Sequence, residues 1–500
     1  MISRKTLPNA ARWFRTEISL SCTTWSGPDT ARAHEARVRH VDIILMLLAV
    51  ALPWSTSVTG ILGVVVAFCI LLNARVELLL TSLKRPASVL PLALLLLAAT
   101  GTTWADGVSW PERLTGVGKM AKLLLLPLLL VHYQSSQRAK WIFAAFVASS
   151  GVLLVHSFLV SAFPALAITT RLDQPGIPVK NYIDQSQGFV VIAVALAALA
   201  FEAAARLKYY LAALLAITSC AFLANLVFIN VARSAFLYAP LMFVLLMVRY
   251  LSRTKVLLGL VGLGLVCGGL WSASPNLQRK VTAIFTEASA YQPDAPIGEK
   301  QPSVALRLEF WRKSLNFFEA APLLGNGTGS IRSLFERDAV GRAGVSALVV
   351  ANPHNQTLAA AVQWGALGLI AIWAMWIAHV HLFRGSELVA WIGMLATVQN
   401  IASSMFNSHL ADFYEGWLYV LFVGIAGGEL LRIRQDTAAS GGSDAPAPGL
   451  CRANRPPAVA EEDPGDEPLN YPRRRKSCER RLEMGGRVRP RSEQAKPMHQ

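Results

Sequence analysis

The sequence predicts an all-α polytopic membrane protein, with about 12 transmembrane helices and one large loop that contains amphipathic helices. The chain has 500 residues, of which 53% are hydrophobic and only 16% are charged. Ordinary soluble domains carry about 25% charged residues. Between Val41 and Arg432, long apolar runs recur that approach the ~20 residues a helix needs to cross a bilayer. Most of the charge lies at the two ends and between these runs.

The apolar runs also divide the chain into five parts. We expect residues 1–40 to be a disordered cytoplasmic tail, 41–273 to hold helices one to nine, 274–356 to form the large loop, 357–432 to hold helices ten to twelve, and 433–500 to be a second disordered tail. The last segment is rich in Pro, Gly, Ala and mixed charge, and such a composition cannot bury a core. The helices are expected at about 41–55, 58–73, 88–104, 119–132, 141–163, 188–205, 209–228, 235–248, 256–273, 357–382, 387–405 and 414–432.

Lysine and arginine residues predict the orientation of these helices, because they collect in cytoplasmic loops. Every second connection is rich in them, and the connections between are poorer. This pattern fits only if both ends are cytoplasmic, and it places residues 274–356 outside the cytoplasm. No cleavable signal peptide is evident, so we expect the first helix to act as an uncleaved anchor. The residues that carry the pattern are Arg75, Lys84, Arg85, Arg138, Lys140, Arg206, Lys208, Arg249, Arg253, Lys255 and Arg384.

The formal net charge of +16 follows from these loops and tails, so we do not expect nucleic-acid binding. The six cysteines lie in apolar runs or tails and not in the large loop, which argues against a disulfide framework. No Cys/His spacing is typical of a zinc site. We therefore expect no metal and no cofactor.

The large loop is predicted to contain an amphipathic helix that starts near Pro302 and Ser303 and is ended by Pro322. Its apolar stripe would be Leu308, Trp311, Leu315 and Phe318, lying on the membrane or on the helix bundle. Arg307 sits one position off that stripe. It is either an arginine that extends its head group to water or a functional residue, and spacing alone favours neither.

Two further stretches of this loop carry candidate chemistry. Residues 325–330, GNGTGS, resemble a phosphate-binding loop only superficially, because no strand precedes them and no Walker-type lysine follows, so we expect a tight turn. At 352–356, Asn352 is the predicted N-cap of a helix, with Pro353 in its first turn. His354 then lies at the positive end of the helix dipole, where it is either a neutral general base or a histidine that only caps the interface.

Two cations are unexpected at the outer surface. Arg233 lies between two helices, and Lys180 lies in a loop before a helix. Short outer loops normally avoid such residues, so a bound anion is a reasonable hypothesis. Arginine suits bidentate contact with phosphate oxygens.

Between about 230 and 430, the chain resembles the O-antigen ligase family, which includes O-antigen polymerases and bacterial protein O-oligosaccharyltransferases. Four stretches carry the likeness, in the family's order. They are ARSA at 232–235; LRLEFW at 306–311 with PLLGNG at 322–327; PHNQTL at 353–358 with GALGL at 365–369; and FNS at 406–408 with Asp412 and Glu415.

The resemblance implies transfer of a glycan from undecaprenyl diphosphate at the outer face of the bacterial inner membrane, with inversion and without metal or nucleotide. It maps the family's two arginines onto Arg233 and Arg307 and its histidine onto His354, which we expect to be catalytic. Lys180 is a candidate phosphate contact, Asp412 is a candidate to orient His354 or bind a sugar, and Asn355 is a further candidate substrate-binding residue. The expected partners are the lipid-linked glycan donor, a lipid A-core acceptor and membrane lipids.

The chain departs from the family pattern at Gln363, where an acidic residue is common. It also lacks a recognisable additional C-terminal domain of the kind found in many protein O-oligosaccharyltransferases, which favours a lipid A-core ligase. An O-antigen polymerase and a protein O-oligosaccharyltransferase stay open as alternatives within the family. A transporter is the alternative outside it, although ionisable residues cluster at helix ends and no halves repeat, as a transporter would require.

Overall fold

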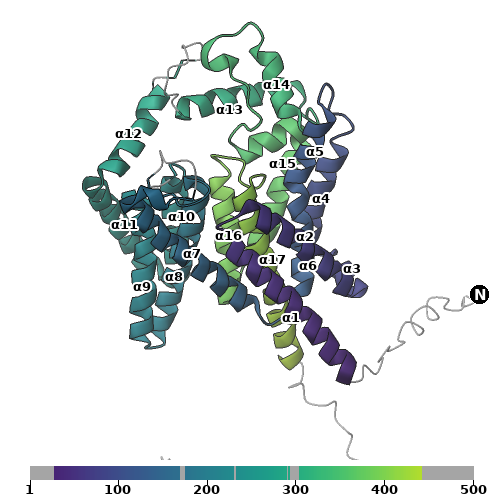
Figure 1. Cartoon of the computed structure of the whole chain (residues 1–500), viewed down its shortest axis with the longest axis vertical. Coiled ribbons are helices and arrows are strands. Elements are labelled where there is room, and N and C mark those ends of the chain that lie inside the picture. The colour runs from purple at the N-terminus through teal and green to yellow at the C-terminus, as the bar shows by residue number, and fades with distance from the viewer. Residues whose placement is uncertain (1–27, 169–174, 230–231, 290, 293–302, 442–500) are drawn as a thin grey trace, which may run out of the picture. The chain divides into compact units, whose positions relative to one another are not determined.

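The computed structural model describes residues 28–168, 175–229, 232–289, 291–292 and 303–441, all within the compact unit Met1–Ser443. These residues form helices and connections, with no strand among them (Figure 1). The α-helices are α1 (Pro28–Ala51), α2 (Thr56–Asn73), α3 (Val76–Ser82), α4 (Pro86–Thr100), α5 (Trp110–Ala121), α6 (Leu125–His132), α7 (Ala139–Ala162), α8 (Tyr182–Ala205), α9 (Tyr209–Ala224), α10 (Ala235–Tyr250), α11 (Arg253–Ala273), α12 (Pro275–Ser289), α13 (Ser303–Ala320), α14 (Ser330–Ala339), α15 (Gln356–Leu382), α16 (Leu388–Ser403) and α17 (Phe413–Gly441). Short 3-10 turns lie at Lys122–Leu124, Pro164–Leu166 and Gly344–Ala347, and a π-helical segment lies at Asn225–Ile229.

The number of candidate membrane spans is smaller than the predicted 12. Within the described residues, eight helices are long and apolar enough to cross a membrane, or nine if α3 and α4, bent by 85°, count as one span. Every predicted helix has a counterpart in the structure, but three of these counterparts are too short or too charged to count as membrane spans. The helices α10 and α16 have 16 residues each, which is about 24 Å against a hydrocarbon layer of roughly 30 Å. The first half of α1 is charged.

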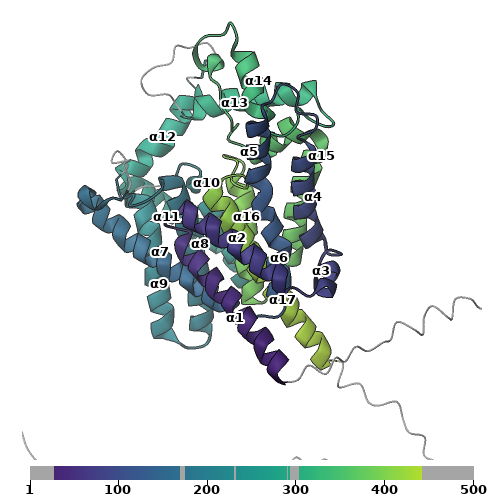
Figure 2. The ribbon, with the colours of Figure 1, turned by 45° about the vertical axis from the view of Figure 1, so that its right-hand side comes forward.

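The all-α polytopic membrane fold is confirmed, with two differences at its ends. Helix α1 begins at Pro28 rather than near Val41, and α17 continues to Gly441 rather than ending near Arg432. The rest of the two predicted tails, 1–27 and 442–500, lies outside the described residues. The start of α1 and the end of α17 lie at one end of the bundle, whereas α12, α13 and α14 lie at the other (Figures 1 and 2).

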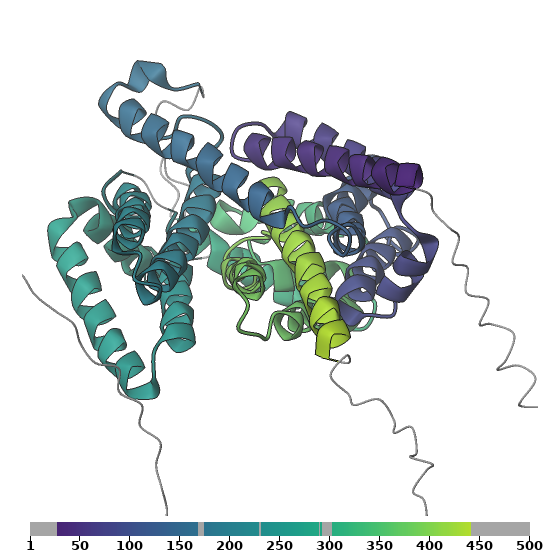
Figure 3. The ribbon, with the colours of Figure 1, turned by 90° about the horizontal axis from the view of Figure 1, so that it is seen from below.

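Helix α17 lies at the centre of the core. It packs against α6 and α16, and its apolar residues from Leu418 to Ile425 are buried. Helix α11 is the opposite case, since it has no buried residue and stands at the edge beside α10. Seen along the bundle, α17 runs between two groups of helices, one containing α8 and α9 and the other containing α4 and α5 (Figure 3).

The glycine-rich stretch at 325–330 forms the predicted tight turn, and its hydrogen bonds attach the large loop to the helix bundle. Gly325, Gly327 and Gly329 all have positive φ, and the backbone N–H of Asn326 donates to Val362 of α15 at 2.9 Å. Helix α15 is broken at Gly365, where φ is 60° and ψ is −147°. A Cβ atom there would lie 2.4 Å from the carbonyl oxygen of Leu323. Glycine is therefore required where the turn meets α15.

The predicted helix of the large loop is confirmed as α13, which runs from Ser303 to Ala320. Leu315 of the predicted apolar stripe is exposed, and the buried residues of the helix include Glu309 and Lys313. Glu309 pairs with Arg312, and Lys313 pairs with Asp338 of α14 at 2.6 Å. These ion pairs allow the helix to bury its charged side. Pro302, the other predicted start residue, lies outside the described residues.

Candidate active site

His354 lies on the connection that leads into α15. The prediction that it belongs to the first turn of this helix is wrong. The N-cap is Asn355, whose side-chain oxygen accepts from the N–H of Leu358 at 3.0 Å. His354 has a φ of 55°, in the left-handed region, and its N–H donates to the side chain of Asn352 at 2.8 Å. Such a conformation is unusual for a residue other than glycine, and strained residues of this kind gather at functional sites. It turns the histidine out of the path of the helix.

A hydrogen-bonded chain fixes the imidazole of His354. Its Nδ1 lies 2.8 Å from Oδ1 of Asn407, and the Asn407 amide nitrogen donates to Oδ2 of Asp412 at 2.7 Å. Asn352 also donates to the same Asn407 oxygen, at 3.1 Å. Since that oxygen can only accept, Nδ1 carries the proton and Nε2 keeps its lone pair. The arrangement presents Nε2 as the basic nitrogen.

The surroundings of His354 keep it neutral. Burial lowers the pKa of His354, the bond to Asn407 raises it, and the nearby positive charge of Arg307 lowers it further, with a net lowering. The ring is stacked on Phe310 of α13, with ring centres 6.1 Å apart. A neutral imidazole with a free Nε2 is competent to accept a proton.

Arg307 and Arg233 lie close enough to interact electrostatically. Arg307 is on α13 and makes no hydrogen bond or ion pair within the described residues, and burial lowers its pKa. Arg233 lies just before α10 and donates to both oxygens of Glu287, at 2.9 and 2.8 Å, and to Ser303 at 2.9 Å. One of the two predicted arginines is thus unpaired, and the other is held by a carboxylate of α12.

Lys280 of α12 is a third cation, which the sequence analysis did not single out. Its ammonium group lies 5.8 Å from the centre of the Tyr182 ring. Burial, and then the positive charges of Arg233 and Arg279, lower its pKa to about 8. Nothing in the sequence distinguishes it from the neighbouring Arg279. Together, Arg233, Lys280 and Arg307 form a cationic cluster that a bound anion would stabilise.

An apolar cleft begins beside this cluster and continues down the bundle. It has a volume of about 620 Å³ and lies between α8, α9, α10, α11 and the first turns of α12. Leu277 and Val281 of α12 line it, on either side of Lys280, and so does Ala235, two residues from Arg233. An elongated apolar molecule with an anionic head would match both the cleft and the cluster.

The structure does not bring Lys180 to the cationic cluster. Its ammonium group donates to the carbonyl of Leu52 at 2.5 Å and lies 5.0 Å from the ring centre of Tyr414. Burial lowers its pKa, against the attraction of Asp184. Asn355 uses both side-chain groups internally, as the N-cap and as a donor to Met405 at 3.1 Å. Lys180 is thus held beside Leu52 and Tyr414, and Asn355 acts as the N-cap of α15.

Asp412 does lie near His354, joined to it through Asn407. Burial raises the pKa of Asp412 to about 6, against the nearby positive charges of Lys122 and Lys119. His409, on the same loop as Asp412, is also buried. Burial, and then the charges of Arg307 and His354, lower the pKa of His409 to about 3. Its Nδ1 lies 3.2 Å from the amide of Gln187. His409 therefore anchors the loop to α8 as a neutral residue.

Residues 218–373 match the family model described as O-antigen ligase. This segment is similar to the O-antigen ligase family. It runs from within α9 to within α15, so it contains Arg233, Lys280, Arg307 and His354. Asn407 and Asp412 lie beyond it. A comparison with curated proteins gives no match.

The match to the O-antigen ligase model supports a role in transferring lipid-linked glycans, and the long apolar helices indicate a multi-pass membrane protein. Within the matched segment, Gln363 accepts from the N–H of Gly329 at 2.9 Å and donates to Ala359 at 3.0 Å. In this chain the residue that departs from the family pattern thus ties the glycine-rich turn to α15. Among the described residues, no group of three or more His, Cys, Asp or Glu side chains is placed to hold a metal ion.

Proposed function

We propose that the protein transfers an O-antigen-type polysaccharide from undecaprenyl diphosphate to a sugar of the lipid A core, at the periplasmic face of the bacterial inner membrane. The observation that carries this proposal is the position of His354 beside a cationic cluster whose Lys280 lies between two residues, Leu277 and Val281, that line an apolar cleft. A polyprenyl diphosphate has the matching chemistry, since it joins a long apolar chain to an anionic head.

The donor would lie with its polyprenyl chain in the cleft and its diphosphate on Arg233, Lys280 and Arg307. Arg307 is available without any rearrangement. Arg233 has to exchange Glu287 for a phosphate oxygen, which accepts charge-assisted hydrogen bonds from arginine as the carboxylate does. When the bond between the sugar C1 and the phosphate oxygen breaks, negative charge grows on the leaving diphosphate. The three cations stabilise that charge.

His354 would take the proton of the attacking acceptor hydroxyl at Nε2. The hydroxyl oxygen forms a bond to C1 of the donor sugar from the face opposite the diphosphate, and the configuration inverts. The bond between Asn407 and Nδ1 keeps the ring in the required tautomer. The positive charge that the ring gains is partly offset by Asp412, through Asn407.

The orientation in the membrane follows the loop charges. With both termini cytoplasmic, the end of the bundle that holds α12, α13 and α14 faces the periplasm. The site at the entry to α15 is then on the side where lipid-linked glycans are assembled into surface polymers.

The test is transfer by the purified full-length protein with a polysaccharide on undecaprenyl diphosphate and three acceptors offered separately. The acceptors are lipid A-core, a lipid-linked single repeat and a peptide. Polymer attached to lipid A-core supports the ligase. Transfer only to the lipid-linked repeat would show a polymerase, and transfer only to the peptide would show a protein O-oligosaccharyltransferase.

A further inference from the structure

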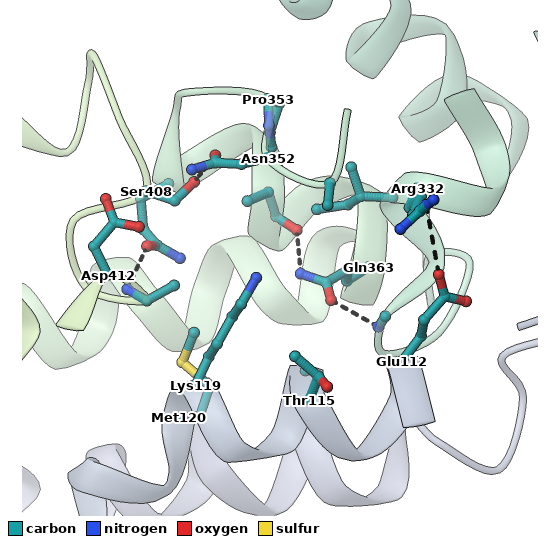
Figure 4. A pocket seen from close by; sticks show the side chains of 17 residues that line it. Glu112, Thr115, Lys119, Met120, Arg332, Asn352, Pro353, Gln363, Ser408 and Asp412 are labelled. Carbon is teal, nitrogen blue, oxygen red and sulfur yellow. Dashed lines mark hydrogen bonds and ion pairs between the residues drawn. The ribbon is translucent and has the colours of Figure 1, made fainter. Parts of the chain in front are cut away.

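A second cavity lies on the other side of the loop that carries His354. It has a volume of about 270 Å³ and is enclosed by α5, the first turn of α14, α15 and the loops at 351–353 and 408–412 (Figure 4). Asn352 and Pro353, directly before His354, line it, and so does Asp412. Neither His354 nor Asn407 lines it, so it adjoins the reacting centre without containing it.

The cavity holds an exposed cation, Lys119, whose charge is close enough to act on Asp412 but which forms no salt bridge with a described residue. Lys119 rises from α5 into the space between Asp412 and Gln363 (Figure 4). Within the described residues, its ammonium group makes no hydrogen bond or ion pair. Lys119 belongs to the candidate membrane span Trp110–His132. An ionisable side chain at such a position marks a functional site more often than a structural one.

Other groups of the cavity are also left without partners. Asp412 uses only Oδ2 for Asn407, and Gln356 uses only its side-chain oxygen, which accepts from the N–H of Ala411 at 3.0 Å. Oδ1 of Asp412 and the amide nitrogen of Gln356 are therefore available to a ligand. At the far end, Arg332 is already paired, with Glu336 at 2.9 Å. The open groups are one cation, one acceptor and one neutral donor.

We infer that this cavity binds an acidic sugar residue of a glycan substrate, with its carboxylate or phosphate on Lys119 and its hydroxyls on Asp412 and Gln356. A volume of about 270 Å³ is at the lower limit of ligand pockets, roughly 300 to 1,000 Å³, and suits a ligand the size of one sugar ring. Paired donors and acceptors around a charged contact are the arrangement that a polyhydroxylated anion requires. The inference rests on the proposed function for its placement next to His354.

The acidic sugar belongs either to the acceptor or to the glycan of the donor. Asn352 and Pro353, which line the cavity, directly precede His354 in the chain, and Asn352 accepts from the N–H of His354. The bound sugar would be a neighbour of the reacting one and would position it, without touching the bonds that change. Lys119 is then a specificity-determining residue.

The first arm of the test measures binding to the detergent-solubilised full chain, without any transfer reaction. The probes are glucuronic acid and glucose 6-phosphate, with glucose as the neutral match and inorganic phosphate as the ion alone. We expect the two acidic sugars to bind more tightly than either control. In Lys119→Gln their affinity should fall about tenfold or more, the loss typical of one charge-assisted hydrogen bond. Lys255→Gln, at an exposed lysine of α11, is the matched control and should change nothing.

Equal binding of glucose and the acidic sugars would overturn the inference, and so would unchanged binding in Lys119→Gln. Equal binding of phosphate and glucose 6-phosphate would show an adventitious anion site and no sugar site. These outcomes leave the proposed transfer untouched, because no transfer is measured.

The second arm assigns the source of the sugar. In the transfer assay, Lys119→Gln should raise KM for whichever substrate carries the acidic residue, with kcat changed little. The assay is then repeated with an acceptor that lacks its acidic group. If the acceptor carries the acidic sugar, Lys119→Gln should no longer change KM; if the donor carries it, Lys119→Gln should still raise the donor KM. A KM unchanged for both substrates would contradict the inference, even where His354→Ala abolishes transfer.

Discussion

The side-chain oxygen of Asn407 lies 2.8 Å from Nδ1 of His354, although 52 residues separate them in the chain. Asp412 fixes that amide from its other side, at 2.7 Å. The contact decides which imidazole nitrogen is free, and it makes Asn407 the positioning residue for the proposed base.

Asn407→Ala should lower kcat roughly tenfold or more, because the imidazole loses its fixed tautomer and orientation. The bond raises the pKa of His354, so its removal should also shift the acid limb of the rate profile to lower pH. The readout is kcat against pH, with Asn73→Ala of α2 as the control. A lower plateau without any shift of the limb would mean that Asn407 supports only the fold.

The pH dependence of the wild type follows from the lowered pKa of His354. A general base works in its unprotonated form, so a lowered pKa extends activity to lower pH. We expect kcat/KM to be flat near neutrality and to fall only below about pH 6.5, the ordinary value of histidine. A profile that already falls between pH 8 and 7 would contradict His354 as a buried neutral base.

Glu287→Gln should lower KM for the lipid-linked donor several-fold. The change removes the carboxylate that competes with the diphosphate for Arg233 but keeps an acceptor for the N–H of Val304, now 3.0 Å from Glu287. Initial rates at varied donor concentration measure the effect. Should the donor KM rise instead, the pair between Arg233 and Glu287 would be part of the binding-competent state and not its competitor.

The apolar cleft is tested by filling it. Gly262 of α11 lines the cleft, while Gly264 does not, and a Cβ at either position meets nothing within 4 Å. Gly262→Trp should therefore raise the donor KM strongly, and the matched control Gly264→Trp should not. The difference should shrink with a donor whose prenyl chain is too short to reach the cleft. An equal donor KM for the two variants would contradict binding of the polyprenyl chain in this cleft.

Gly365→Ala should destabilise the protein. Alanine would have to adopt a φ of 60° and place its Cβ against the Leu323 carbonyl. Strained backbone of this kind costs about 1–3 kcal/mol before the clash is counted. The melting temperature in detergent should fall by several degrees. Gly151→Ala in α7, where a Cβ meets nothing within 4 Å, should leave it unchanged. A similar melting temperature for both variants would contradict the claim that the close contact between the 325–329 turn and α15 requires glycine at position 365.

Hydropathy predicted the helices well, because an apolar run has few alternatives to a helix in a membrane. Length was harder to judge. The connection after Ser82 bends the chain by 85°, which a hydropathy pattern does not show. The short apolar runs that became α10 and α16 were counted as full spans. The burial of Glu309 and Lys313 on α13 was not predicted, because their ion pairs include partners, such as Asp338, that are distant in sequence.

The site could be predicted only in part. Arg233, Arg307 and His354 were identified from the motifs, and the structure brings them together. Lys180 was grouped with them because it is an unexpected outer cation, but its ammonium group is bound to Leu52. Lys280 and Lys119 were missed because their significance depends on neighbours from other helices, which spacing along one chain does not reveal.

The most direct test of the central claim is the rate of polymer transfer to lipid A-core by purified His354→Ala, Arg233→Ala and Arg307→Ala, each compared with the wild type. We expect the loss of the base to lower the rate by about 10²–10⁴-fold, and each arginine variant to lose transfer through its weakened hold on the leaving diphosphate. Asn73→Ala again serves as the control for handling and folding. Wild-type rates in all three variants would contradict the account.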